Sequence, residues 1–198
     1  MKFACCLLLL STLAGTVWAG EVLPLYGEWR FRLDPGDEGI AGEWFRATLP
    51  EVVTLPGSLN ENGVGDPITA ETAWTGTMTS RMWHEDPRFA PYRDPENTKI
   101  LFWLQPDKRY VGAAWYQMEV DVPAAVEHDH LEIVLERCHW ETRAWVDGQA
   151  VGSRNSLSTA HVYDVTGILT PGIHTITLRV DNTYAIDVGI NAHSVSDN

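Results

Sequence analysis

The chain has 198 residues, of which 44% are hydrophobic and 21% charged, enough for one folded domain with a hydrophobic core. It carries 14 basic against 27 acidic residues, a formal net charge of -13. A field of this sign repels nucleic acid and anionic lipid, so neither is expected as a partner.

Residues 1–19 have the pattern of a signal peptide. Lys2 gives a short positive region, residues 3–10 an apolar one, and Val17 and Ala19 are small residues at the positions that a signal peptidase reads. We expect cleavage after Ala19 and export of residues 20–198, either to the periplasm or out of the cell. No later segment is long and apolar enough to span a bilayer as a helix.

Removal of that segment would leave Cys138 as the one cysteine. The mature chain is then expected to form no internal disulfide and no cysteine metal cluster. Cys138 follows an apolar, strand-like run, so we expect a buried apolar side chain and not a nucleophile.

Several segments alternate apolar and polar residues with a period of two, as half-buried β-strands do. In the first of them Trp29, Phe31 and Leu33 share one face, with arginines between them on the other. The further predicted strands are 116–122, with Gln117 on the polar face, 131–135, 176–180 and the nearly continuous apolar run Lys99–Leu104.

Turn residues separate these strands. Asp147–Gly148 between two apolar runs predicts a hairpin, and Pro171–Gly172 a second tight turn. Short strands with such turns predict an all-β, antiparallel sandwich or jelly roll. Residues 36–95, rich in Gly, Pro and acidic residues, predict long loops that serve function or an interface.

The chain resembles the N-terminal sugar-binding domain of glycoside hydrolase family 2 enzymes, which include β-galactosidases, β-glucuronidases and β-mannosidases. The resemblance is carried by pieces in the family's order and approximate spacing: Leu25–Asp34, Leu55–Ser58, Ala114–Pro123, Glu141–Gly152, Tyr163–Thr166, Leu169–Gly172 and Leu178–Asn182. One departure is Glu136-Arg137-Cys138, where the family often has Glu-Gly-Val.

The resemblance implies an all-β, antiparallel jelly-roll β-sandwich similar to galactose-binding domains. It also implies that this is a non-catalytic domain of an enzyme that hydrolyses O-glycosidic bonds. In that family the two catalytic glutamates belong to a (β/α)₈ barrel of about 250 residues. That barrel would be absent from this chain, so the sandwich is expected to be incomplete at its C-terminal end and inactive alone. The implied partners are a β-glycoside and the missing barrel, with self-association through the interface that the barrel would leave exposed.

By the same resemblance, the domain's loops help to form one wall of the sugar pocket. The expected sugar ligands are Asn191, His193 and Asp197, with Trp83 as a stacking platform; packing at the domain interface is the other explanation for each of them.

Seven acidic residues form three groups that are close in sequence and could supply a catalytic pair: Asp34 with Asp37 and Glu38, Glu85 with Asp86, and Asp94 with Glu96. We expect these to be solvated loop residues without catalytic roles. Residues 127–130, Glu-His-Asp-His, are expected to be a polar turn, so no metal ion or cofactor is predicted.

A free-standing carbohydrate-binding module is the alternative function. It has the same predicted fold, and nine Trp residues supply flat surfaces for stacking on a sugar. The third hypothesis for the function is a structural or partner-binding β-sandwich.

Overall fold

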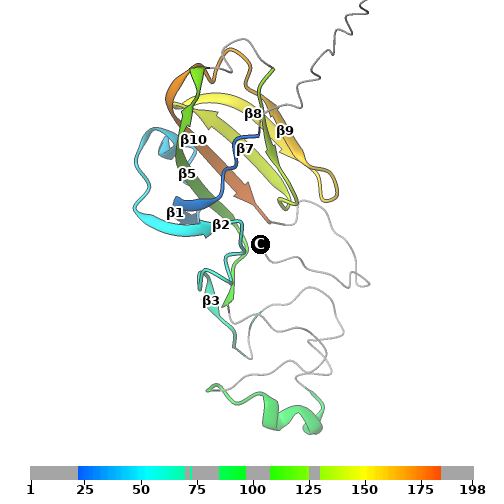
Figure 1. Ribbon diagram of the computed structural model, residues 1–198. Coiled ribbons are helices and arrows are strands. Elements are labelled where there is room, and N and C mark those ends of the chain that lie inside the picture. The colour runs from blue at the N-terminus through cyan, green and yellow to red at the C-terminus, as the bar shows by residue number, and fades with distance from the viewer. Residues whose placement is uncertain (1–21, 70–71, 73–84, 97–107, 125–129, 184–198) are drawn as a thin grey trace, which may run out of the picture.

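The computed structural model describes residues 22–69, 72, 85–96, 108–124 and 130–183. These residues form strands and two short 3₁₀ helices (Figure 1). The strands are β1 Gly27–Asp34, β2 Glu51–Leu55, β3 Asp66–Pro67, β4 Lys108–Arg109, β5 Ala113–Val122, β6 Glu132–Leu135, β7 Glu141–Val146, β8 Gln149–Asn155, β9 His161–Asp164 and β10 Gly172–Asp181. The helices are η1 Trp44–Arg46 and η2 Pro87–Tyr92.

Six strands make one antiparallel sheet in the order β2-β1-β5-β10-β7-β8. Its centre is the pair β5 and β10, which runs from Gly172 opposite Val122 to Asp181 opposite Ala113. On the inner face, Phe31 lies opposite Tyr116, and Tyr116 lies opposite Leu178. These large apolar side chains form rows across the sheet, because each strand has an apolar residue at every second position.

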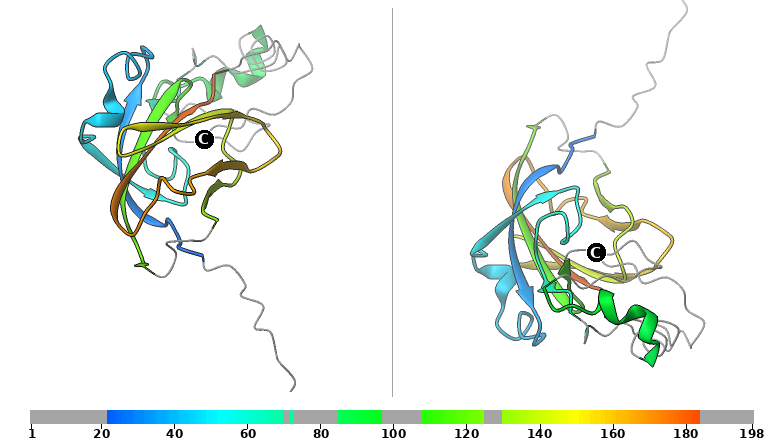
Figure 2. Two further views of the ribbon diagram at one scale, coloured as in Figure 1. Left: turned by 90° about the horizontal axis from the view of Figure 1, so that it is seen from above. Right: turned by 90° about the horizontal axis from the view of Figure 1, so that it is seen from below.

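A second layer, the antiparallel pair β6 and β9, lies across the concave face of this sheet (Figure 2). Its inward side chains, Ile133 and Tyr163, join Phe31 and Leu178 in one buried core. The prediction of an all-β, antiparallel sandwich is therefore confirmed. In the described part of the chain no helix is long and apolar enough to cross a membrane.

The strands predicted from periodicity at 28–33, 116–122 and 176–180 fall within β1, β5 and β10, and the one at 131–135 begins one residue before β6. The predicted hairpin joins β7 to β8, with a positive φ at both Asp147 (50°) and Gly148 (77°). This is the conformation of a type I′ turn, which Asp-Gly favours. The predicted strand Lys99–Leu104 lies outside the described residues.

The outer face of the sheet differs from the prediction at Gln117, which is buried and not at a solvated face. Residues 36–50 fold back over this face and cover it. Gln117 Nε2 donates to Ala47 O at 3.0 Å, and its Oε1 accepts from Leu49 N at 3.3 Å. Because the segment packs on the sheet, the first half of β5 (residues 113–117) and the second half of β10 are buried on both faces.

The position of Asp34 also differs from the prediction. We expected a solvated loop residue, and the structure buries Asp34 at the end of β1. Its carboxylate accepts from Glu38 N at 2.8 Å, Gly39 N at 2.9 Å and Trp115 Nε1 at 2.8 Å. These bonds fix the start of residues 36–50, so Asp34 has a structural role.

Candidate functional site

The four sugar ligands expected from the sequence, Asn191, His193, Asp197 and Trp83, all lie outside the described residues. The structure therefore does not place them. The structure instead shows a groove between the two layers of the sandwich, which was not predicted from the sequence.

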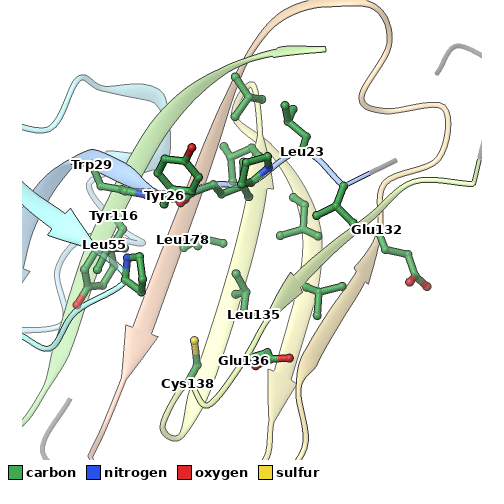
Figure 3. Close-up of a pocket in the computed structure, with 18 of the residues that line it drawn as sticks. Leu23, Tyr26, Trp29, Leu55, Tyr116, Glu132, Leu135, Glu136, Cys138 and Leu178 are labelled. Atoms are coloured by element: carbon green, nitrogen blue, oxygen red, sulfur yellow. Dashed lines mark hydrogen bonds between the residues drawn. The ribbon is translucent and has the colours of Figure 1, made fainter. Parts of the chain in front are cut away.

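An open groove of about 940 Å³ separates β6 from the first residues of the described chain. Its floor is the inner face of the large sheet, from Trp29 and Tyr116 to Leu178. One wall is formed by residues 130–139, which contain β6, and the opposite wall by residues 22–26 and 55–59 (Figure 3). The groove is thus a solvent-accessible gap between the two layers of the sandwich, lined by core residues.

The sequence explains why the floor is apolar. Strands β5 and β10 send alternate residues to the inner face, and these are Tyr116, Val120, Ile176 and Leu178 among others. The wall at residues 22–26 is held in place by Trp29, whose Nε1 donates to Leu25 O at 3.1 Å. Leu23 and Tyr26 of this wall remain about half to two-thirds exposed, at 49% and 68%.

The second wall has an unusual lining, because consecutive residues of β6 border the groove. Ile133 and Leu135 send their side chains toward the core, whereas Glu132 and Val134 are exposed on the other face of the strand. A strand that lines a groove with residues of both faces presents its edge to that groove.

Hydrogen bonds show which main-chain groups lie on that edge. Val165 N donates to Leu131 O at 2.9 Å, so Leu131 and Val165 form a hydrogen-bonded pair. In an antiparallel ladder such pairs alternate with non-bonded pairs. The register then makes Glu132 and Val134 members of non-bonded pairs, with their N–H and C=O groups directed away from β9 and toward the groove.

Few polar side chains enter the groove. Burial raises the pKa of the Cys138 thiol to about 11 and raises the pKa of Tyr116 as well. Both groups therefore stay protonated at neutral pH, and Cys138 is not an activated nucleophile. At the upper rim His130 lies 3.1 Å from Glu132 and 3.1 Å from Thr166 Oγ1.

Arg137, beside Cys138, has a left-handed backbone with φ 58°. Glycine adopts this conformation most readily. Arg137 therefore stands where the Glu-Gly-Val pattern has glycine, at a backbone position that suits glycine better than arginine.

Asp86, Asp94 and Asp37, three of the carboxylates considered from the sequence, each have a partner in the structure. Asp86 caps η2 and pairs with Arg88, which lowers the pKa of Asp86 to about 2. Asp94 Oδ1 accepts from Glu96 N at 2.9 Å. Asp37 Oδ1 lies 2.6 Å from the buried guanidinium of Arg179.

No group of three or more His, Cys, Asp or Glu side chains that could hold a metal ion occurs among the residues that the structure describes. Of the predicted polar turn at 127–130, only His130 belongs to them.

Polar side chains at two strand ends satisfy main-chain groups of neighbouring loops. Asp164 Oδ1 accepts from Thr166 N at 2.9 Å, and Thr166 Oγ1 accepts from Leu131 N at 3.0 Å. Asn182 binds the loop before β5 with both ends of its amide: Oδ1 accepts from Gly112 N at 2.7 Å, and Nδ2 donates to Tyr110 O at 2.9 Å. These residues are explained by the fold.

Comparison of the sequence with models of protein families and with curated proteins found no match. Solved structures do match. A β-glucuronidase from Ruminococcus gnavus in complex with uronic isofagomine superposes over 80% of this chain with a TM-score of 0.53 and 17% identity. A β-glucuronidase of an uncultured Clostridium species superposes with a TM-score of 0.52 and 20% identity. The β-glucuronidase of Lactobacillus rhamnosus superposes with a TM-score of 0.54 and 16% identity. Each covers 80% of this chain.

The chain shares its fold with part of these β-glucuronidases. It spans 20–21% of their length. At this level of identity the likeness establishes the fold alone.

Proposed function

We propose that residues 20–198 are the non-catalytic, N-terminal β-sandwich of an exported glycoside hydrolase of family 2. The longer enzyme would hydrolyse O-glycosidic bonds of β-glycosides in carbohydrate metabolism. The observation that carries this proposal is the superposition of 80% of the chain on a fifth of several β-glucuronidases. The order of the family-like sequence segments, from Leu25–Asp34 to Leu178–Asn182, supports it independently.

The catalytic step is assigned to another part of the longer polypeptide. Retaining glycoside hydrolysis needs two carboxyl groups about 5 to 5.5 Å apart across the scissile bond. Two of the carboxylates considered from the sequence have structural roles: Asp34, at the end of β1, anchors residues 36–50, and Asp86 caps η2. We therefore propose that the chain positions loops beside the catalytic barrel and does not itself carry out the chemistry.

Asn191, His193, Asp197 and Trp83 are the residues that we propose to reach the sugar pocket. Side-chain amide, imidazole and carboxylate groups bond sugar hydroxyls, and a Trp face covers the apolar face of a pyranose. The test is made in the longer enzyme. Asn191→Ala and Trp83→Ala should raise KM for an aryl β-glycoside, whereas Val52→Ala, on the outer face of the described sheet, should leave KM unchanged. Unchanged KM in both pocket variants would remove these residues from the site.

Export is tested by mass spectrometry of the protein recovered from its host. We expect the mature chain to begin at Gly20, after cleavage behind Ala19. Recovery of an intact Met1 terminus from the cytoplasm would contradict this part of the proposal.

Calorimetric titration of the 198-residue chain with galactosides, glucuronides and mannosides separates the proposed domain from a free-standing sugar-binding module. We expect no measurable heat from the isolated chain, because the described groove is apolar and a wall of the sugar pocket comes from the barrel. Saturable binding of one sugar would favour the module instead.

A further inference from the structure

We propose that Asn62 is a site of spontaneous deamidation, through attack by the main-chain nitrogen of Gly63, and that this modification releases the free edge of β2. The site lies in the loop of residues 56–64, which follows β2 and is called the clip below. The inference concerns the sandwich itself and does not depend on the proposed function.

The clip holds the edge of β2 through one side chain. Asn62 Oδ1 accepts from Thr54 N at 2.8 Å, and Asn62 Nδ2 donates to Thr54 O at 3.1 Å and to Ser58 O at 2.9 Å. The N–H and C=O groups of one residue in an antiparallel strand point to the same side. Those of Thr54 therefore point away from β1, where Glu28 is its partner. Asn62 thus occupies the free edge of β2, the outermost strand of the six-stranded sheet.

An exposed strand edge can pair with another chain unless it is blocked. At β2 two prolines, Pro50 and Pro56, flank the strand and supply no N–H group. Between them the Asn62 amide presents one donor and one acceptor to Thr54, as the peptide group of a neighbouring strand would. Asn62 therefore blocks this edge at Thr54.

The sequence makes Asn62 chemically reactive, because it is the one asparagine of the chain that is followed by glycine. Glycine has no side chain to hinder its nitrogen. That nitrogen loses its proton to water and bonds to Cγ of Asn62, while the bond from Cγ to Nδ2 breaks and ammonia leaves after taking up a proton. One water molecule then opens the five-membered imide at either carbonyl and leaves aspartate or isoaspartate in place of Asn62.

The folded clip slows this reaction. Gly63 N is engaged in a hydrogen bond to Asn60 O at 2.9 Å, and the three bonds of the Asn62 amide fix its Cγ. The clip is stiffened by a capping box: Glu61 Oε2 accepts from Ser58 N at 2.8 Å, and Glu61 N donates to Ser58 Oγ at 3.1 Å. Ring closure therefore requires local opening of the clip, and its rate follows the open population.

Deamidation would remove the donor that holds the clip to the strand. A carboxylate oxygen in the place of Nδ2 would lie 3.1 Å from Thr54 O and 2.9 Å from Ser58 O, with no hydrogen to share. Negatively charged oxygens at this distance repel each other. The carboxylate would leave the edge, and the main-chain groups of Thr54 would be freed.

The first experiment incubates the 198-residue chain in mildly alkaline buffer and follows Asn62 by peptide mass spectrometry, as the replacement of –NH2 by –OH. Glu61→Ala removes the carboxylate of the capping box, whereas Glu61→Gln, equally neutral, keeps an acceptor for Ser58 N. We expect conversion about fivefold faster in Glu61→Ala and within about twofold of the wild type in Glu61→Gln. Near-ultraviolet circular dichroism verifies that each variant is folded.

The second experiment uses Asn62→Asp, which has the product's side chain from the start. Amide hydrogen exchange at Thr54 should be at least about tenfold faster in this variant than in the wild type at neutral pH. Exchange at Val53 is the internal control and should not change, because its N–H points toward β1.

Three results would overturn the proposal: conversion of another asparagine of the folded chain before Asn62, equal conversion rates in Glu61→Ala and Glu61→Gln, or unchanged exchange at Thr54 in Asn62→Asp. None of these results depends on glycosidase activity, so a failure here leaves the proposed function standing.

Discussion

Trp115 donates its indole N–H to Oδ2 of Asp34 at 2.8 Å, although the two residues are 81 positions apart. The same carboxylate accepts the main-chain N–H groups of Glu38 and Gly39. One buried side chain thus joins β1, β5 and the start of the segment that covers the outer face. The outer face and the groove are opposite sides of the same sheet, so this contact helps to hold the groove's floor.

Replacement of Asp34 by Asn should destabilise the fold. An amide offers one acceptor oxygen where the carboxylate offers two, so a buried donor among Glu38 N, Gly39 N and Trp115 Nε1 loses its partner. We expect the free energy of unfolding to fall by about 2 kcal/mol. Urea denaturation followed by Trp fluorescence measures this change. Glu38→Gln, in the same segment but exposed, is the control and should stay within about 0.5 kcal/mol of the wild type.

Gly39 has no room for a side chain. A Cβ there would overlap the indole nitrogen of Trp115 and lie 2.7 Å from Asp34 Oδ2. Gly39→Ala should therefore cost about 1–3 kcal/mol through overpacking. Gly36→Ala is the matched variant, because its Cβ would meet only the flexible side chain of Glu38, at 3.3 Å. Equal unfolding midpoints for both variants would show that residues 36–50 do not pack on Trp115 as described.

The β7–β8 turn should make stability depend on pH. Asp147 Oδ2 lies 2.6 Å from His174 Nδ1, and this hydrogen bond raises the pKa of His174 above its ordinary value of 6.5. Partial burial of Asp147 opposes ionisation, but hydrogen bonds from Thr175 and His174 lower its pKa below 3.8. The pair therefore stabilises the fold fully between roughly pH 4 and pH 6.5.

Above that range the contribution of His174 is lost as the pH rises through its folded pKa; below it the contribution of Asp147 is lost as the pH falls through its own. Because half of Asp147 is exposed, solvent screens the pair, and we expect about 0.5 kcal/mol. Urea midpoints at about pH 6 and about pH 8 should differ more in the wild type than in Asp147→Asn. The same difference in both proteins would mean that another group is responsible.

Cys138 should react slowly with thiol reagents in the native protein. Burial raises its pKa to about 11 from 9.0, which lowers the thiolate fraction at neutral pH about a hundredfold. The rate of alkylation by iodoacetamide, followed by peptide mass spectrometry at Cys138, should rise strongly in urea. Rapid native alkylation at this site would place the thiol in a more exposed or electropositive environment than the structure gives it.

Much of the fold could be predicted from the sequence, because strands with one buried face alternate visibly. Trp29, Phe31 and Leu33 give the inner face of β1, and Asp147–Gly148 gives the β7–β8 turn. The strand β2 was missed, since its five residues bury only Val53 and show little alternation. Burial of Gln117 and Asp34 was missed for a different reason: it depends on residues 36–50 returning across the sheet, a long-range contact that leaves no local periodic signal.

The groove could not be predicted either. Its floor consists of core residues such as Tyr116 and Leu178, whose pattern is the same whether or not another layer covers them. The open edge of β6 appears only when the strand order is known, because Glu132 and Val134 look like ordinary solvent-facing residues of a half-buried strand. The residues predicted from family resemblance, such as Asn191, remain predictions.

The rate of 4-nitrophenol release from aryl β-glucuronide, β-galactoside and β-mannoside is the most direct test of the central claim. It is measured for the 198-residue chain and for the longer protein proposed to contain it. We predict turnover of at least one substrate by the longer protein and none above background by the chain alone. Turnover by the 198-residue chain, or a longer protein that cleaves no glycoside, would contradict the assignment of this sandwich as a non-catalytic domain of a glycoside hydrolase.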